Sequence, residues 1–101
     1  MKIMKSLVEH IREEVDDAMK YAKTAMLIKA DDQTVSNVYR DLAQEEIKHA
    51  EKLHKAAMDV VLRYGATGRE APAAMREIWD FEHALMIDKL AVAKQMVDTL
   101  L

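Results

Sequence analysis

The sequence predicts an all-α fold in which two long antiparallel helices form a hairpin and a third helix packs beside it. Three segments of the 101-residue chain are rich in Ala, Met, Leu, Glu and Lys, which favour helices. Both glycines and the only proline lie in "YGATGREAP" at 64–72, outside the interiors of these segments. The predicted helices therefore span 3–29, 33–64 and 71–100, each about 30 residues and about 45 Å long.

A weaker helix-breaking signal separates the first two helices, at "KADDQT" in 29–34. Asp31 or Asp32 can cap the second helix here by accepting hydrogen bonds from its free N–H groups. Because so short a turn makes the two helices antiparallel neighbours, residues whose numbers sum to about 63 lie at the same height.

The composition narrows the classes of function. With 18 acidic and 15 basic residues the net charge is −3, so no basic surface attracts nucleic acid. No run approaches the roughly 20 apolar residues of a membrane span, and "MKIMKSLVEHIREE" lacks the apolar stretch of a signal peptide. The expected location is therefore cytoplasmic. Because the chain has no cysteine, any metal must be held by Glu, Asp and His.

Alternating steps of four and three residues trace an apolar seam along each predicted helix. Glu14 alone interrupts the first seam, and Glu46 and His49, one turn apart, interrupt the second. The first seam consists of Met4, Leu7, Ile11, Glu14, Ala18, Tyr21, Ala25 and Ile28. The second consists of Val35, Tyr39, Leu42, Glu46, His49, Leu53, Ala56 and Val60.

Glu14, Glu46 and His49 are expected to meet in one layer of the hairpin, since Glu14 comes level with His49. Burying two carboxylates and an imidazole without compensation would cost several kcal/mol, and a cation neutralises them most directly. Oxygen and imidazole ligands without sulfur suit iron, manganese or zinc. The competing interpretation is a buried Glu–His hydrogen-bonded cluster that specifies helix register, with the hydroxyls of Tyr21 or Tyr39 as further partners.

Two further acid-x-x-His pairs, Glu51 with His54 and Asp80 with His83, lie off the centres of the apolar arcs. Exposed pairs with this spacing are common on helices. Both are therefore predicted to be mainly solvated surface pairs.

The third segment has a seam that Glu82 and Lys89 interrupt. This seam consists of Met75, Ile78, Glu82, Leu85, Lys89, Val92 and Met96, widened by Trp79, Met86 and Ala93. Glu82 is expected near the height of Leu53 and His10, one to two turns from the Glu14 layer, so it is a poor ligand for the same ion. It either pairs with Lys89, contacts another subunit, or forms an auxiliary metal site with His10 or with a second subunit.

Residues 9–57 resemble the ferritin-like, rubrerythrin-like superfamily. The resemblance rests on Glu14 and Tyr21 in "EEVDDAMKYAKTA" and on Glu46 and His49 in "LAQEEIKHAEKLH". Full-length members carry two such helix pairs, whereas this chain carries one. It is therefore more similar to the short encapsulated ferritins, in which two subunits complete the site, although the helical end "MVDTLL" differs from the flexible tail of encapsulin cargo.

The resemblance implies a ferritin-like four-helix bundle completed by dimerisation, with two iron ions per dimer. Glu14 would be a terminal ligand, Glu46 a bridging ligand and His49 a ligand to one iron, in a site that oxidises Fe(II) with oxygen or peroxide. Tyr21 could hydrogen-bond a ligand or supply an electron. Independently, one protomer offers too few ligands for two ions, and a two-fold axis doubles them.

The rival expectation is a non-enzymatic helical oligomerisation or interaction module. It uses the same hairpin and the same dimer. It needs no oxygen chemistry and is either metal-free or holds a structural metal.

Overall fold

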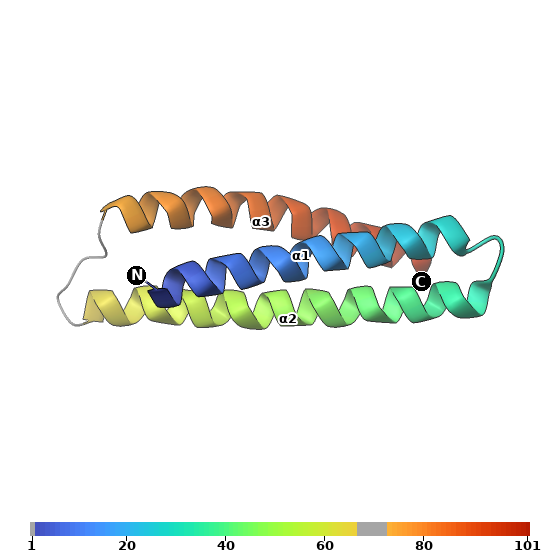
Figure 1. The fold of residues 1–101 in the computed structure, drawn as a ribbon, viewed down its shortest axis with the longest axis horizontal. Coiled ribbons are helices and arrows are strands. Elements are labelled where there is room, and N and C mark those ends of the chain that lie inside the picture. Colours follow the sequence, from blue (N-terminus) through green and yellow to red (C-terminus); the bar gives the residue numbers. More distant parts are fainter. Residues whose placement is uncertain (1, 67–72) are drawn as a thin grey trace.

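Three long helices make up the described part of the chain (Figure 1). The structure is a computed structural model that describes residues 2–66 and 73–101, and within these gives the backbone alone at 64–66, 73–78 and 81. Gly68 and Pro72 of the predicted break lie outside the described residues.

The helices are α1 (Lys2–Ile28), α2 (Gln33–Ala66) and α3 (Ala73–Leu100). Their bounds agree within two residues with the predicted ones, and no strand occurs in the residues described, so the all-α prediction is confirmed. The three rods form an elongated body whose principal extents are 56 × 20 × 18 Å.

The connection between α1 and α2 is a short capped turn. Of the two aspartates predicted as caps, Asp32 accepts a hydrogen bond from the backbone N–H of Val35 at 3.0 Å. The Asp32 N–H in turn donates to the Ile28 carbonyl at 2.8 Å. Ser36 is buried, and its hydroxyl donates to the Ala25 carbonyl at 2.7 Å. The start of α2 is thus fixed to the last turn of α1.

Helix α3 runs in the same direction as α1 and antiparallel to α2, and it packs against both (Figure 1). Lys89 forms an ion pair with Asp16 of α1 at 3.3 Å, and Lys94 one with Glu51 of α2 at 2.9 Å. Exposed pairs of this kind contribute about 0–1 kcal/mol each. Burial of apolar side chains therefore holds α3 in place.

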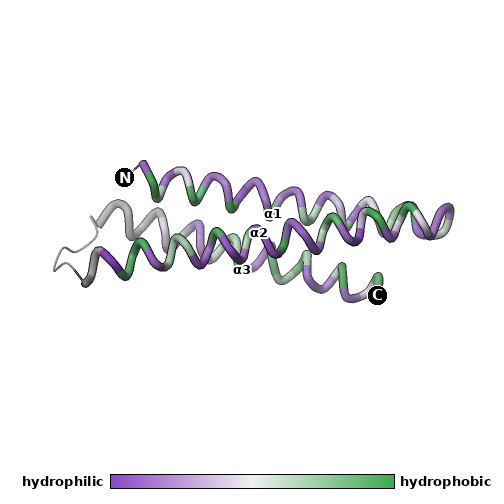
Figure 2. Tube along the Cα trace, turned by 90° about the horizontal axis from the view of Figure 1, so that it is seen from below, coloured by the Kyte–Doolittle hydropathy of each residue, from purple (hydrophilic) through white to green (hydrophobic). Residues whose placement is uncertain are grey.

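Among the side chains that the structure describes, the core forms two clusters along the long axis. The larger cluster contains Met4, Val8, Ile11, Val15, Ala50, Ala57, Val60, Trp79 and Met86. The smaller one, nearer the α1–α2 turn, contains Ala18, Ala22, Ala43, Ile47, Ala93 and Val97. Figure 2 shows hydrophobic and hydrophilic residues alternating along each helix. None of the described helices combines the length and the apolar character that crossing a membrane requires.

The buried faces of α2 and α3 are displaced by one residue from the predicted seams, which are wrong in this respect. The buried residues of α2 are Ser36, Ala43, Ile47, Ala50, Ala57 and Val60, of which only Val60 belongs to the predicted seam. On α3, Leu85 and Val92 of the predicted seam are 42% and 46% exposed. The residues expected only to widen that seam, Trp79, Met86 and Ala93, are buried instead.

The displacement has a physical cause. Helix α3 covers one side of the groove between α1 and α2, and the core forms on that side. The predicted seam of α2 lies about 100° away around the helix. Its residues other than Val60 are therefore half-buried or exposed within the single chain.

Candidate metal centre

Glu14, Glu46 and His49 converge between α1 and α2, as predicted. One ligand atom from each lies within 4.8 Å of the other two, and in the part of the chain that the structure describes this is the one such group of three. His49 Nδ1 is 3.6 Å from Glu14 Oε2 and 3.7 Å from Glu46 Oε1. The predicted height of Glu14, level with His49, is thereby confirmed.

The local sequence explains why these side chains share one side of the hairpin. Glu46 and His49 are three residues apart and therefore neighbours on the surface of α2. Val15 and Ile47, each next to a carboxylate, are only 1% and 7% exposed. By packing into the core they set the rotation of both helices, which turns Glu14 and Glu46 toward the edge of the groove.

The three side chains of the centre are buried to different extents. The side chains of Glu14 and Glu46 are 15% and 18% exposed, whereas that of His49 is 57% exposed. His49 therefore lies at the rim, and the expectation of an entirely dry layer is wrong for this residue. The centre therefore has two largely buried carboxylates and one solvent-exposed imidazole.

One buried carboxylate oxygen of the centre has no hydrogen-bond partner among the described residues. Glu14 Oε2 is buried and has no hydrogen-bond donor among the described residues. Leaving a buried polar atom unsatisfied costs about 1–3 kcal/mol, and more when the group is charged. A cation held between Glu14, Glu46 and His49 would satisfy this oxygen, so the residues present fit a metal ion.

His10 contacts Glu14 of this centre and not Glu82. Its Nε2 lies 3.2 Å from Glu14 Oε1, one helical turn away on α1. Sequence reasoning paired His10 with Glu82 and missed this contact. The i, i+4 spacing of His10 and Glu14 was the signal that could have revealed it.

Glu82 is neutralised by a different partner from those expected. It forms an ion pair with Arg12, whose guanidinium is hydrogen-bonded to it. This hydrogen bond, together with the charge of Glu82, raises the pKa of Arg12. Lys89 pairs with Asp16 instead. The structure therefore does not bring Glu82 and His10 together as ligands, although Glu82 lies close to the height predicted for it.

Tyr21 lies two turns from the centre, toward the α1–α2 turn. Its ring centroid is 6.1 Å from that of Tyr39, with the planes tilted by 42°. Since Tyr21 follows Glu14 by seven residues and Tyr39 precedes Glu46 by seven, the two rings form the next layer along the hairpin. In the described residues neither hydroxyl hydrogen-bonds to the centre.

The histidines of the two other acid-x-x-His pairs are partly buried and not mainly solvated, contrary to the prediction. His54 and His83 are partly buried and meet each other, with Nε2 atoms 2.6 Å apart. Their acidic companions, Glu51 and Asp80, are exposed as predicted. The structure thus contains a histidine pair that the sequence pattern alone did not reveal.

The resemblance to the ferritin-like superfamily depends on Glu14, Tyr21, Glu46 and His49. The hairpin places the first, third and fourth of these within one small group and Tyr21 two turns away. Comparisons with protein-family models, with curated proteins and with solved structures found no match to the chain.

Proposed function

We propose that this chain is a di-iron carboxylate protein that binds Fe(II) and oxidises it at a site shared between two copies. The proposal depends most on the buried oxygen of Glu14, which faces Glu46 and His49 and lacks a donor among the residues described. A cation bound between these side chains would supply the missing partner of this oxygen.

The ligand types favour iron among the possible ions. Two carboxylates and one imidazole, with a second imidazole at His10, form a mixed oxygen and nitrogen set without sulfur. Such sets bind iron, manganese or zinc, and the resemblance to ferritin-like proteins favours iron. Bound iron supplies the electron-transfer chemistry with oxygen or peroxide. The chain's own residues hold the ion, and the open side at His49 gives Fe(II) access to the carboxylates.

A second copy would complete the ligand set and cover an apolar surface. Val35 lies on the face of α2 that carries Glu46 and His49, and it is 41% exposed. Tyr39 and Leu42, on the same face, are only partly buried. A second hairpin packed over this face would bury these side chains and bring a second set of ligands to the centre.

Anaerobic Fe(II) titration tests the proposal. We expect saturable binding of about one iron per chain in the parent. Glu46→Ala and His49→Ala should each weaken or abolish it. Glu45→Ala is the matched control, because it removes an exposed carboxylate from the same turn of α2. Parent-like iron binding by Glu46→Ala, or no saturable binding by the parent, would refute the proposal.

The alternative is a non-enzymatic helical interaction module, metal-free or with a structural metal. It is favoured by the contacts of His10 and His49 with Glu14, since protonated imidazoles could balance the carboxylate without a metal. Oxygen consumption after addition of Fe(II) separates the two functions. Accelerated oxidation that Glu46→Ala abolishes supports the oxidase, and binding without acceleration supports the module.

A further inference from the structure

His54 of α2 and His83 of α3 form a tight pair on the other side of the hairpin. Their ring centroids are 4.7 Å apart and their planes differ by 11°. The two Nε2 atoms are only 2.6 Å apart, so both nitrogens lie close to the line between the rings and point toward each other. The two imidazoles therefore meet edge to edge through their Nε2 atoms.

Trp79 packs against both rings. It is 7% exposed, and its ring lies at 15° to His83 with centroids 5.1 Å apart. The plane of Trp79 lies at 25° to that of His54, with ring centroids 5.9 Å apart. The histidine pair thus packs against a buried aromatic side chain of the same helix as His83.

One Nε2 of the pair carries a lone pair, which faces the other ring. Two Nε2–H groups pointing at each other at 2.6 Å would clash, so one ring donates and the other accepts. Burial, and next the charge of His83, lower the pKa of His54. Neutral imidazole is the form that binds metal ions.

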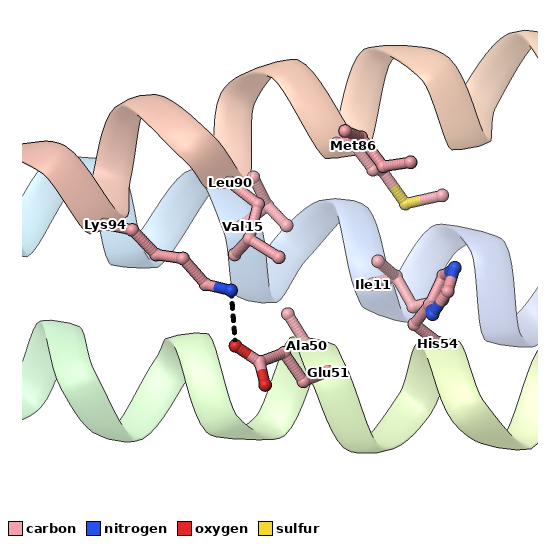
Figure 3. A pocket seen from close by; sticks show the side chains of 9 residues that line it. Ile11, Val15, Ala50, Glu51, His54, Met86, Leu90 and Lys94 are labelled. Atoms are coloured by element: carbon pink, nitrogen blue, oxygen red, sulfur yellow. Dashed lines mark ion pairs between the residues drawn. The ribbon is translucent and has the colours of Figure 1, made fainter.

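Space for an ion and its waters lies beside His54. A cavity of about 370 Å³ is lined by His54, Glu51, Met86, Lys94 and apolar residues of all three helices. Figure 3 shows His54 at one end of it, near Met86, and the Glu51–Lys94 ion pair toward the other end. Outward rotation of the His54 ring into this space would separate the two Nε2 atoms.

We propose that His54 and His83 form a second metal site, which binds a transition-metal ion of the imidazole-preferring class, Cu(II) or Zn(II). Bonds of about 2.0–2.1 Å from each Nε2 to one ion place the nitrogens about 2.9 Å apart at the right angle typical of Cu(II), and about 3.3 Å apart at the tetrahedral angle of Zn(II). The observed 2.6 Å thus requires a small opening and a tilt of both rings. In the described residues no carboxylate joins them in a compact group, so water supplies the other ligands.

The proton balance of binding is simple. In the neutral pair, one imidazole already presents a lone pair at Nε2. The other transfers its proton from Nε2 to Nδ1, so the neutral pair releases no proton. A pair that carries one extra proton releases it when the ion binds. Asp80, one turn before His83, adds negative charge near the ion, whereas Lys94 offsets the charge of Glu51.

Trp79, the only tryptophan of the chain, provides a local measurement. Cu(II) quenches the fluorescence of a nearby indole, so titration of the full chain should show saturable quenching at about one Cu(II) per chain. His54→Gln and His83→Gln should each weaken binding by at least about tenfold. The double variant should lose saturable quenching, and Zn(II) should restore the fluorescence of the Cu(II)-loaded parent.

Two controls separate this site from the Glu14 centre. Glu46→Ala and His10→Gln should leave the quenching unchanged, because His54 is five residues beyond His49 and about 140° around α2 from it. Electron paramagnetic resonance of the Cu(II) form should show a nitrogen-coupled signal that is reduced in the double variant, which retains the imidazoles near Glu14, with circular dichroism confirming its helix content. Quenching in the double variant equal to that in the parent, or a parent without saturable quenching, overturns the proposal, whatever the iron titration shows.

Discussion

Glu14 Oε2 and His49 Nδ1 lie 3.6 Å apart across the hairpin, although 35 positions separate the residues in the sequence. The contact follows from the antiparallel packing of α1 and α2 around a turn at Asp32. The second oxygen of Glu14 is buried and has no hydrogen-bond donor among the described residues. The stability of the hairpin is therefore coupled to what occupies this centre.

Replacing Glu14 by glutamine should separate the effects of its charge from those of its shape. Without metal, we expect Glu14→Gln to be neutral or stabilising by up to about 1 kcal/mol, since it removes a poorly solvated charge beside Glu46. With Fe(II) under anaerobic conditions, the parent should gain about 2.7 kcal/mol at 100 times its Kd, and the variant much less. Thermal unfolding with chelator and with Fe(II) measures both quantities.

Glu13→Gln is the matched control for this experiment, because it removes an exposed carboxylate from the adjacent position of α1. It should leave the gain in stability from Fe(II) unchanged. An equal gain in Glu14→Gln and in the parent would mean that the ion binds elsewhere.

The Arg12–Glu82 pair should stabilise the docking of α3 more than the other ion pairs do. Glu82 is 14% exposed, so Arg12→Ala would leave a largely buried carboxylate without its partner. We expect a loss of about 1 kcal/mol, reduced from the value for a fully buried pair because Arg12 is half exposed. Urea unfolding of the two single variants and of the double variant with Glu82→Ala measures the coupling.

Arg63→Ala provides the comparison, since Arg63 and its partner Asp59 are 69% and 65% exposed. Its removal should change the free energy of unfolding by less than about 0.5 kcal/mol. A coupling near zero for Arg12 and Glu82 would show that solvent screens that pair as well.

Capping of α2 should depend on one aspartate and not on its neighbour. Asp32→Ala removes the acceptor for the Val35 N–H and should cost about 1 kcal/mol. Asp31→Ala, which alters an exposed residue just before the cap, should cost less than half as much. Thermal unfolding of the two variants distinguishes them, and equal losses would contradict the assignment of the cap.

The helices and the height of the Glu14 layer could be predicted from the sequence because both depend on local signals. Helix-favouring composition sets the extent of each segment, and the turn at Asp32 sets the register. The rotation of α2 could not be predicted in the same way. Ala43 and Ala50 are fully buried but count little in an apolar pattern dominated by Tyr39 and Leu42.

The His54–His83 pair escaped sequence reasoning for a related reason. Both residues lie at the edges of helix faces whose burial depends on where α3 docks. The position of α3 depends on contacts between helices and not on local sequence. A displacement of one residue, about 100°, changes a predicted surface histidine into a partly buried one. Trp79, which lies on the same displaced face, was the available signal, because a large aromatic side chain tends to mark the core.

Acid should destabilise the protein through His54. Burial lowers its pKa below the ordinary value of 6.5, so in the folded protein it resists a proton that the unfolded chain accepts. Its contribution to stability is therefore fully present above pH 6.5 and is lost as the pH falls below that value through the folded-state pKa. Denaturant unfolding between pH 5 and 8 should show a decrease that His54→Gln reduces. An unchanged pH profile in the variant would show that other groups cause the decrease.

Association should depend on the face of α2 that carries Glu46 and His49. Val35 lies on this face, and Val35→Glu would place a charge in the contact that a second hairpin makes. Leu62→Glu introduces the same charge at a residue that is 66% exposed and about 160° around α2 from Glu46. Sedimentation equilibrium should give the parent and Leu62→Glu at least twice the monomer mass of 11.5 kDa. Val35→Glu should shift toward the monomer and lose iron binding in parallel, because each hairpin alone provides half of the ligands. A parent of monomer mass that still binds iron would eliminate the shared site but leave the Glu14 centre intact.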